Sequence, residues 1–268
     1  MNNKSSTTNE SSTTKGVVSL FPTPVMKVNI NRSFTESEMQ CIVNIPLEKK
    51  NKDGVIMSNH RSESYYLFGK KHGSLLGRNE VKRRFKEANI IQKRIDVKNE
   101  FLTSEKREME RWREIVTHVF DDVENFEECF NELHNHFSVP ESWPIYSGAK
   151  ELLEYLNEKG IRMIVASNFD YRLKNIVKKT DIGKMCETIL VSSKLGYRKP
   201  NSEFFISICN DLELSKENIL YVGDDLENDY QGARAIGMPA VLLDKNDDGE
   251  NVFESLEALS EEIKTAYN

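Results

Sequence analysis

The sequence predicts an α/β fold: a Rossmann-like parallel sheet with helices on both faces, plus an inserted all-helical cap. Apolar runs of strand length alternate with helical patterns from residue 149 to residue 243, as in parallel sheets. Residues 64–137 instead carry only helical patterns, which indicates a separate helical layer. Polar clusters follow several expected strands, and ligands of such sheets gather at the carboxyl ends of strands.

The bulk composition is typical of a globular protein that binds neither membranes nor nucleic acids. Of 268 residues, 38% are hydrophobic and 30% charged, and the net charge is −6, which disfavours contact with phosphate backbones. No apolar run approaches the roughly 18 residues that span a bilayer, and the polar start does not resemble a secretory signal. The scattered cysteines indicate reduced thiols and a cytoplasmic location: Cys41, Cys129, Cys186 and Cys209.

The N-terminal region divides into an expected disordered tail, residues 1–16, and a segment of uncertain origin, residues 17–63. Apolar and polar residues alternate over 25–30, which predicts a short strand. Ser33 or Thr35 then fits a helix cap, with Met39, Ile42 and Val43 as the apolar face of that helix.

The remaining chain divides into a predicted helical cap, residues 64–140, and an α/β core, residues 141–268. Helical spacing of apolar residues predicts three cap helices, over 65–88, 101–120 and 123–137. In the core we expect strands over 161–166, 188–191, 219–222 and 239–243, and helices over 149–159, 173–179, 203–212 and 230–236.

Two polar clusters follow the first two core strands. Ser167 and Asn168 combine a hydroxyl and an amide at a strand end, a combination that can bind phosphate oxygens; a helix cap is the plainer alternative. Lys199 precedes Pro200, which favours an extended backbone and lets the ammonium group point into an anion site. Surface lysines are common, so this signal is weak by itself.

A third cluster, Gly223 followed by Asp224, Asp225 and later Asp229, comes directly after an apolar strand. Mg²⁺ prefers oxygen ligands, usually one or two carboxylates with water and substrate phosphate. Carboxylates at a helix start can also be stabilised by the helix dipole, but that explains only Asp229. The cluster therefore favours a magnesium site.

In order and separation, these three clusters resemble the second, third and fourth motifs of the haloacid dehalogenase superfamily of hydrolases. The resemblance implies a phosphatase that acts on a small phosphorylated molecule and uses Mg²⁺. It implies Ser167 and Asn168 as phosphate-binding residues and Lys199 as a phosphate-binding and catalytic cation. It further implies that the metal is held by Asp224 and Asp229, with Asp225 beside them, and that the cap closes over substrate.

The family's first motif, a strand followed by Asp-x-Asp, is not found in this sequence. Asp53 is the one aspartate before Asp96, it follows no apolar strand, and the second aspartate position would be Val55. The opening residues, 20–25 and 33–38, resemble phage-type 2-oxoglutarate/Fe(II) oxygenases, but the His-x-Asp/Glu iron pair of that family does not occur.

Two hypotheses follow from the missing motif. The chain is either a phosphohydrolase with an unconventional nucleophile, or a catalytically inactive domain that still binds phosphate and Mg²⁺. In the second case it could be a fused or recombined gene product, in which a foreign N-terminal segment replaced the strand that carries the nucleophile.

Overall fold

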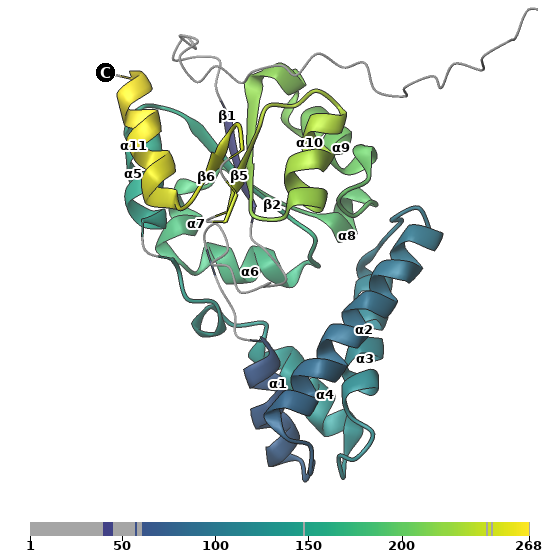
Figure 1. Cartoon of the computed structure of the whole chain (residues 1–268). Helices are drawn as coiled ribbons and strands as arrows, with labels where there is room; N and C mark the ends of the chain where they lie inside the picture. Colours follow the sequence, from purple (N-terminus) through teal and green to yellow (C-terminus); the bar gives the residue numbers. More distant parts are fainter. Residues whose placement is uncertain are drawn as a thin grey trace, which may run out of the picture.

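The computed structural model describes residues 40–44, 57, 61–146, 148–244, 246–247 and 249–267. Figure 1 shows two parts: a sheet flanked by helices, and a group of helices standing to one side of it. The sheet has six strands in the order β3-β2-β1-β4-β5-β6, and every neighbouring pair is parallel. The predicted class, a parallel Rossmann-like sheet with a helical cap, is confirmed.

The centre of the sheet is β1 (Gln40–Asn44), which comes from the N-terminal segment. It pairs on one side with β2 (Arg162–Ser167) and on the other with β4 (Ile219–Gly223), so that Gln40 faces both Arg162 and Ile219. The sequence-based prediction of a helix containing Ile42 and Val43 is therefore wrong. A short apolar run fits a buried strand as well as a helix, and pairing on both sides decides for the strand.

Several N-terminal predictions lie outside the described residues. These are the tail 1–16, the alternating stretch 25–30, Asp53, and the segments that resemble an oxygenase. The central slot of the sheet, beside β2, is occupied by 40–44 and not by 25–30.

The outer strands are β3 (Thr188–Val191), β5 (Ala240–Leu243) and the short β6 (Val252–Phe253). The four predicted core strands are confirmed within one residue at each end, whereas β6 was not predicted. Alternation along β2 builds two cores, because Val165 packs in one cluster and Ile164 and Ala166 pack in the other.

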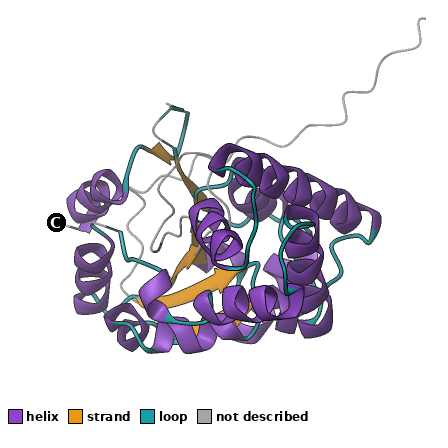
Figure 2. Ribbon diagram, turned by 90° about the horizontal axis from the view of Figure 1, so that it is seen from below, coloured by secondary structure: helices purple, strands orange, loops and turns teal. Residues whose placement is uncertain are grey.

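Helices cover both faces of the sheet (Figure 2). One face carries α5 (Ala149–Glu158), α6 (Arg172–Lys178), α7 (Asp181–Met185) and α11 (Leu256–Tyr267). The other carries α8 (Ser192–Leu195), α9 (Ser202–Leu212) and α10 (Gly232–Ala235). Two short 3₁₀ turns, η1 (Pro140–Ser142) and η2 (Lys216–Asn218), and a short π-helix, η3 (Leu226–Gln231), complete this part of the chain.

The cap consists of α1 (Arg61–Lys71), α2 (Arg78–Lys98), α3 (Glu105–Val119) and α4 (Phe126–His136). It therefore has four helices where the sequence predicted three. The first predicted segment breaks after α1 because Gly73 takes a φ of 86°, and α2 begins after Gly77. An aromatic cluster that includes Tyr65, Phe120 and Phe137 joins the helices. None of the described helices is long and apolar enough to cross a membrane.

We expect Ile42→Pro to destabilise the core by roughly 2 kcal/mol or more, because proline removes a backbone donor from a strand paired on both sides. Ile42→Val, which preserves the β-branched chain, should change the free energy of unfolding by less than about 1.5 kcal/mol. Urea denaturation followed by circular dichroism measures both. Parent-like stability of Ile42→Pro would show that residues 40–44 are not part of the sheet.

Candidate functional site

The predicted site residues lie at one edge of the sheet. Ser167 is the last residue of β2, Asn44 is the last residue of β1 and pairs with Ala166, and Gly223 is the last residue of β4. Because these neighbouring strands are parallel, their carboxyl ends meet at the same edge. The clusters after β2 and β4 therefore lie on either side of the end of β1.

Lys199 connects the two clusters. Its ammonium group is buried and donates a hydrogen bond of 2.5 Å from Nζ to Oδ1 of Asp229. Asn168 binds the backbone of Lys199 twice: Nδ2 donates to the Lys199 carbonyl at 3.2 Å, and Oδ1 accepts from its N–H at 2.8 Å. In this structure the Asn168 amide thus positions Lys199.

Asp229 is fully buried beneath the loop that follows β4. Besides the Lys199 ammonium, its carboxylate accepts the Asp225 backbone N–H at 3.1 Å and the Tyr221 hydroxyl at 3.4 Å. Gly223 makes this packing possible, since a Cβ there would lie 2.2 Å from Cβ of Asp229. The Lys199–Asp229 pair is therefore a compensated buried ion pair.

The other two aspartates of the cluster differ from each other. Asp225 is exposed, and its Oδ1 accepts the backbone N–H groups of Glu227 and Asn228, so it caps η3. Asp224 is more buried, and its Oδ1 has no hydrogen-bond partner among the described residues. Burial, together with the nearby Asp229 and Asp225 carboxylates, raises the pKa of Asp224 to about 8, while Lys199 opposes the rise.

The residues present fit a divalent cation only at Asp224. Within the described ranges, no group of three or more His, Cys, Asp or Glu side chains is arranged to hold a metal. Of the predicted ligands, Asp229 compensates Lys199 and Asp225 caps a turn, whereas Asp224 has an unused buried oxygen. A cation held by one carboxylate, water and ligand oxygens is compatible with this donor set.

Sequence reasoning missed two parts of this site. Asn44, at the end of β1, is followed in the sequence by Ile45 and Pro46. The available signal for a strand end there was a short apolar run followed by a polar residue, with Ile45 held extended by Pro46. In the sequence Tyr221 is typical of a strand residue, and nothing there indicated that its hydroxyl contacts Asp229.

Residues 52–237 match the family model of the haloacid dehalogenase-like hydrolases, which is more than half of the chain. The chain belongs to this family. It is 26% identical to haloacid dehalogenase-like hydrolase domain-containing protein 3 of Xenopus laevis, over 68% of this chain and 76% of the relative. The human protein of the same name is also 26% identical, over 72% of this chain and 78% of its own length.

Solved structures agree on the fold of this dehalogenase-like chain. A hydrolase of the family from Bacillus subtilis, crystallised with magnesium, superposes with a TM-score of 0.67 at 16% identity, over 85% of this chain and 99% of that one. A family phosphatase from Thermococcus onnurineus gives 0.56 at 19% identity, over 83% and 96%. The match to the family model confirms the family resemblance that the three motifs indicated, and the solved structures confirm the fold.

Asp224→Asn should stabilise the folded chain at alkaline pH when metals are removed. The folded pKa lies above the ordinary value of 3.8, so stability falls as the pH rises from about 4 towards 8, where the carboxyl loses its proton. We expect a gain of about 1–3 kcal/mol at pH 9 that vanishes near pH 3.5. Denaturant titration in EDTA measures it.

Asp225→Asn is the comparison variant, because asparagine caps turns about as well as aspartate. It removes only one of the charges that act on Asp224, so its gain at pH 9 should be clearly smaller than that of Asp224→Asn. Equal stability of Asp224→Asn and parent at pH 9 would contradict the strained carboxyl at Asp224.

Proposed function

We propose that this chain binds a small phosphorylated molecule at the carboxyl edge of its sheet and has lost the covalent step of phosphate hydrolysis. The observation that carries the proposal is the end of the central strand. Where relatives of this type are expected to have Asp-x-Asp, β1 ends in Asn44, and Ile45 and Pro46 follow.

The chemistry of these residue types supports the loss. A carboxylate oxygen can attack phosphorus and form an aspartyl-phosphate, whereas a neutral amide is a poor nucleophile. The residue two positions on would act as general acid and base, and Pro46 has no group that exchanges protons. Loss of a nucleophile typically costs several orders of magnitude in rate.

Features suited to binding a phosphate group remain. Ser167 lies at the end of β2 next to β1, and Lys199 provides a buried cation whose counterion can be shared with an incoming anion. Asp224 would hold Mg²⁺ through its unused oxygen, and a bound Mg²⁺ would offset the charge of the phosphate. A phosphorylated ligand is also supported by relatives with phosphatase names.

One of these relatives is a ribulose-1,5-bisphosphate 5-phosphatase of Halopiger xanaduensis, 29% identical over 41% of this chain and 46% of its own length. These relatives also support the second candidate function, a Mg²⁺-dependent phosphohydrolase that uses a different nucleophile. Asp53, outside the described residues, is the candidate nucleophile for that function.

Inorganic phosphate with Mg²⁺ should bind the parent protein, and Lys199→Met combined with Asp229→Asn should weaken binding about tenfold or more. The double substitution removes both charges of the ion pair, so no lone buried charge is left. Isothermal titration calorimetry measures the affinity, and Lys194→Met, which removes an exposed lysine nearby, is the control. Equal binding by parent and double variant would exclude a phosphate site at Lys199.

Restoring the two aspartates should restore the chemistry. We expect negligible Mg²⁺-dependent release of p-nitrophenol from p-nitrophenyl phosphate by the parent, and measurable release by Asn44→Asp with Pro46→Asp. Asn44→Asp alone should be slower by about 100-fold or more, because the general acid is missing. Adding Lys199→Met together with Asp229→Asn to the active variant should abolish turnover without leaving a lone buried charge. Parent turnover that is lost in Asp53→Asn would instead favour the second candidate function.

A further inference from the structure

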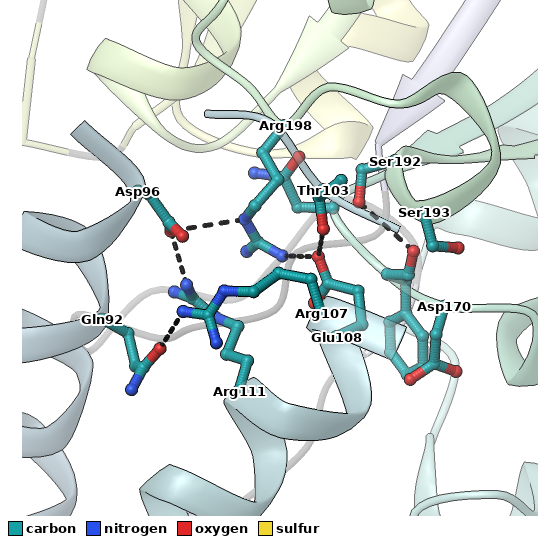
Figure 3. Close-up of polar contacts among 12 residues, drawn as sticks. Gln92, Asp96, Thr103, Arg107, Glu108, Arg111, Asp170, Ser192, Ser193 and Arg198 are labelled. Atoms are coloured by element: carbon teal, nitrogen blue, oxygen red, sulfur yellow. Dashed lines mark hydrogen bonds and ion pairs between the residues drawn. The ribbon is translucent and has the colours of Figure 1, made fainter. Parts of the chain in front are cut away.

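A buried ionic cluster lies between the cap and the core (Figure 3). Its member from the core, Arg198, directly precedes Lys199 in the sequence. Arg198 contacts Glu108 of α3 through Nη1, and its Nε lies 3.5 Å from Oδ2 of Asp96 on α2. Arg111 of α3 completes the cluster at 2.5 Å from the same Asp96 oxygen. Thr103 donates to Oε1 of Glu108 at 2.8 Å.

The cluster is closely balanced in charge and hidden from solvent. It contains two arginines and two carboxylates, and the side chains of Arg198, Asp96 and Glu108 are no more than 8% exposed. Burial opposes ionisation of Glu108, but Arg198 and Arg111 hold its pKa below the ordinary value. Because Arg198 belongs to the core and its two carboxylate partners belong to the cap, the cluster joins the cap to the core at this point. Loss of one member would leave an uncompensated buried charge.

Backbone contacts join the same two segments. The turn between α2 and α3 pairs with the residues before Lys199: Thr103 N–H donates to the Gly196 carbonyl, and Arg198 N–H donates to the Phe101 carbonyl, each at 2.9 Å. Glu100 and Phe101 take φ values of 52° and 60°, a left-handed conformation that is costly for residues other than glycine. Such a turn persists when its surroundings hold it, as the pairing with the core does here.

We infer that Arg198 is a positioning residue: it links the position of the Lys199 backbone to the position of the cap. Phe101 and the cluster fix Arg198 from the cap side, and Asn168 and Asp229 fix Lys199, its neighbour, from the core side. Because Arg198 and Lys199 share a peptide bond, displacement of the α2–α3 turn would pull Lys199 against its bonds to Asn168 and Asp229, so cap position and anion binding at Lys199 are coupled. The anion part of this inference rests on the proposed function.

Coupling of this kind is reciprocal: if the cap favours phosphate binding by some factor, phosphate favours the docked cap by the same factor. The probe is inorganic phosphate with Mg²⁺, and the variants are Arg198→Lys, which keeps one charge but cannot reach both carboxylates, and Glu108→Gln. Arg113→Lys is the matched control, because Arg113 pairs with Glu127 inside the cap.

Two measurements are made on each protein: phosphate affinity by calorimetry, and amide hydrogen exchange residue by residue by NMR. We expect Arg198→Lys and Glu108→Gln to lower phosphate affinity about fivefold or more and to speed exchange at the Lys199 amide. In the parent, phosphate should slow exchange at the Thr103 amide, and this effect should shrink in both variants. Arg113→Lys should behave as the parent.

The outcomes separate the two proposals. If the parent binds no phosphate, the proposed function fails, and the inference is judged on exchange at the Lys199 amide without ligand. Faster exchange there in Arg198→Lys supports the positioning role, and unchanged exchange overturns it. If the variants lose stability but keep parent affinity and parent exchange at Lys199, Arg198 only fastens the cap, and the inference is wrong.

Discussion

The pairing of β1 with both β2 and β4 is the constraint on which this molecule depends. Without these five residues the sheet would divide into β3-β2 on one side and β4-β5-β6 on the other. Asn168 follows β2 and Asp229 follows β4, so the hydrogen bonds that both make with Lys199 exist because β1 holds the two strands at a fixed spacing. A strand from the N-terminal segment thus lies at the centre of a site whose other residues come from the C-terminal half.

The site contains several buried ionisable side chains, and only some of them have a partner that compensates their charge. Lys199 and Asp229 neutralise each other, and the Tyr221 hydroxyl and the Asp225 amide satisfy more of the carboxylate. Asp224 has no such support at Oδ1 and is driven towards its protonated form. The difference matters for function, since a compensated pair is stable by itself, whereas an uncompensated carboxyl gains from a bound cation.

The sequence was sufficient where apolar runs were long and followed by polar residues. Ile164 and Val165 in β2, and Leu220 and Val222 in β4, marked buried strands, and the clusters after them indicated the right edge of the sheet. It was insufficient for β1, whose apolar run, Cys41 to Val43, is too short for its period to separate strand from helix. A helix-start pattern just before it favoured the wrong choice.

Long-range contacts could not be predicted from the sequence, for a different reason. Arg198 and Glu108 are 90 residues apart, and no local pattern indicates that they pair. The amide of Asn168 looked like a phosphate ligand because its residue type allows that role, but its two bonds go to the Lys199 backbone. Residue types at a strand end thus predict that a site exists, while the partner of each group depends on packing that only the folded chain defines.

The presence of Lys199, Asp229 and Gly223 does not by itself argue for catalysis. Lys199 and Asp229 hold β2 to the loop after β4, and Gly223 is required by the packing of Asp229, so all three have a structural role. Asp224 has no structural task of that kind, and its burial beside two other carboxylates costs stability. Under the proposed function a divalent cation would compete with a proton for this carboxyl, and its binding would remove the cost. The unpaired buried oxygen of Asp224 is therefore the feature of the site that most favours the proposed bound ligand, even though the central strand ends in asparagine.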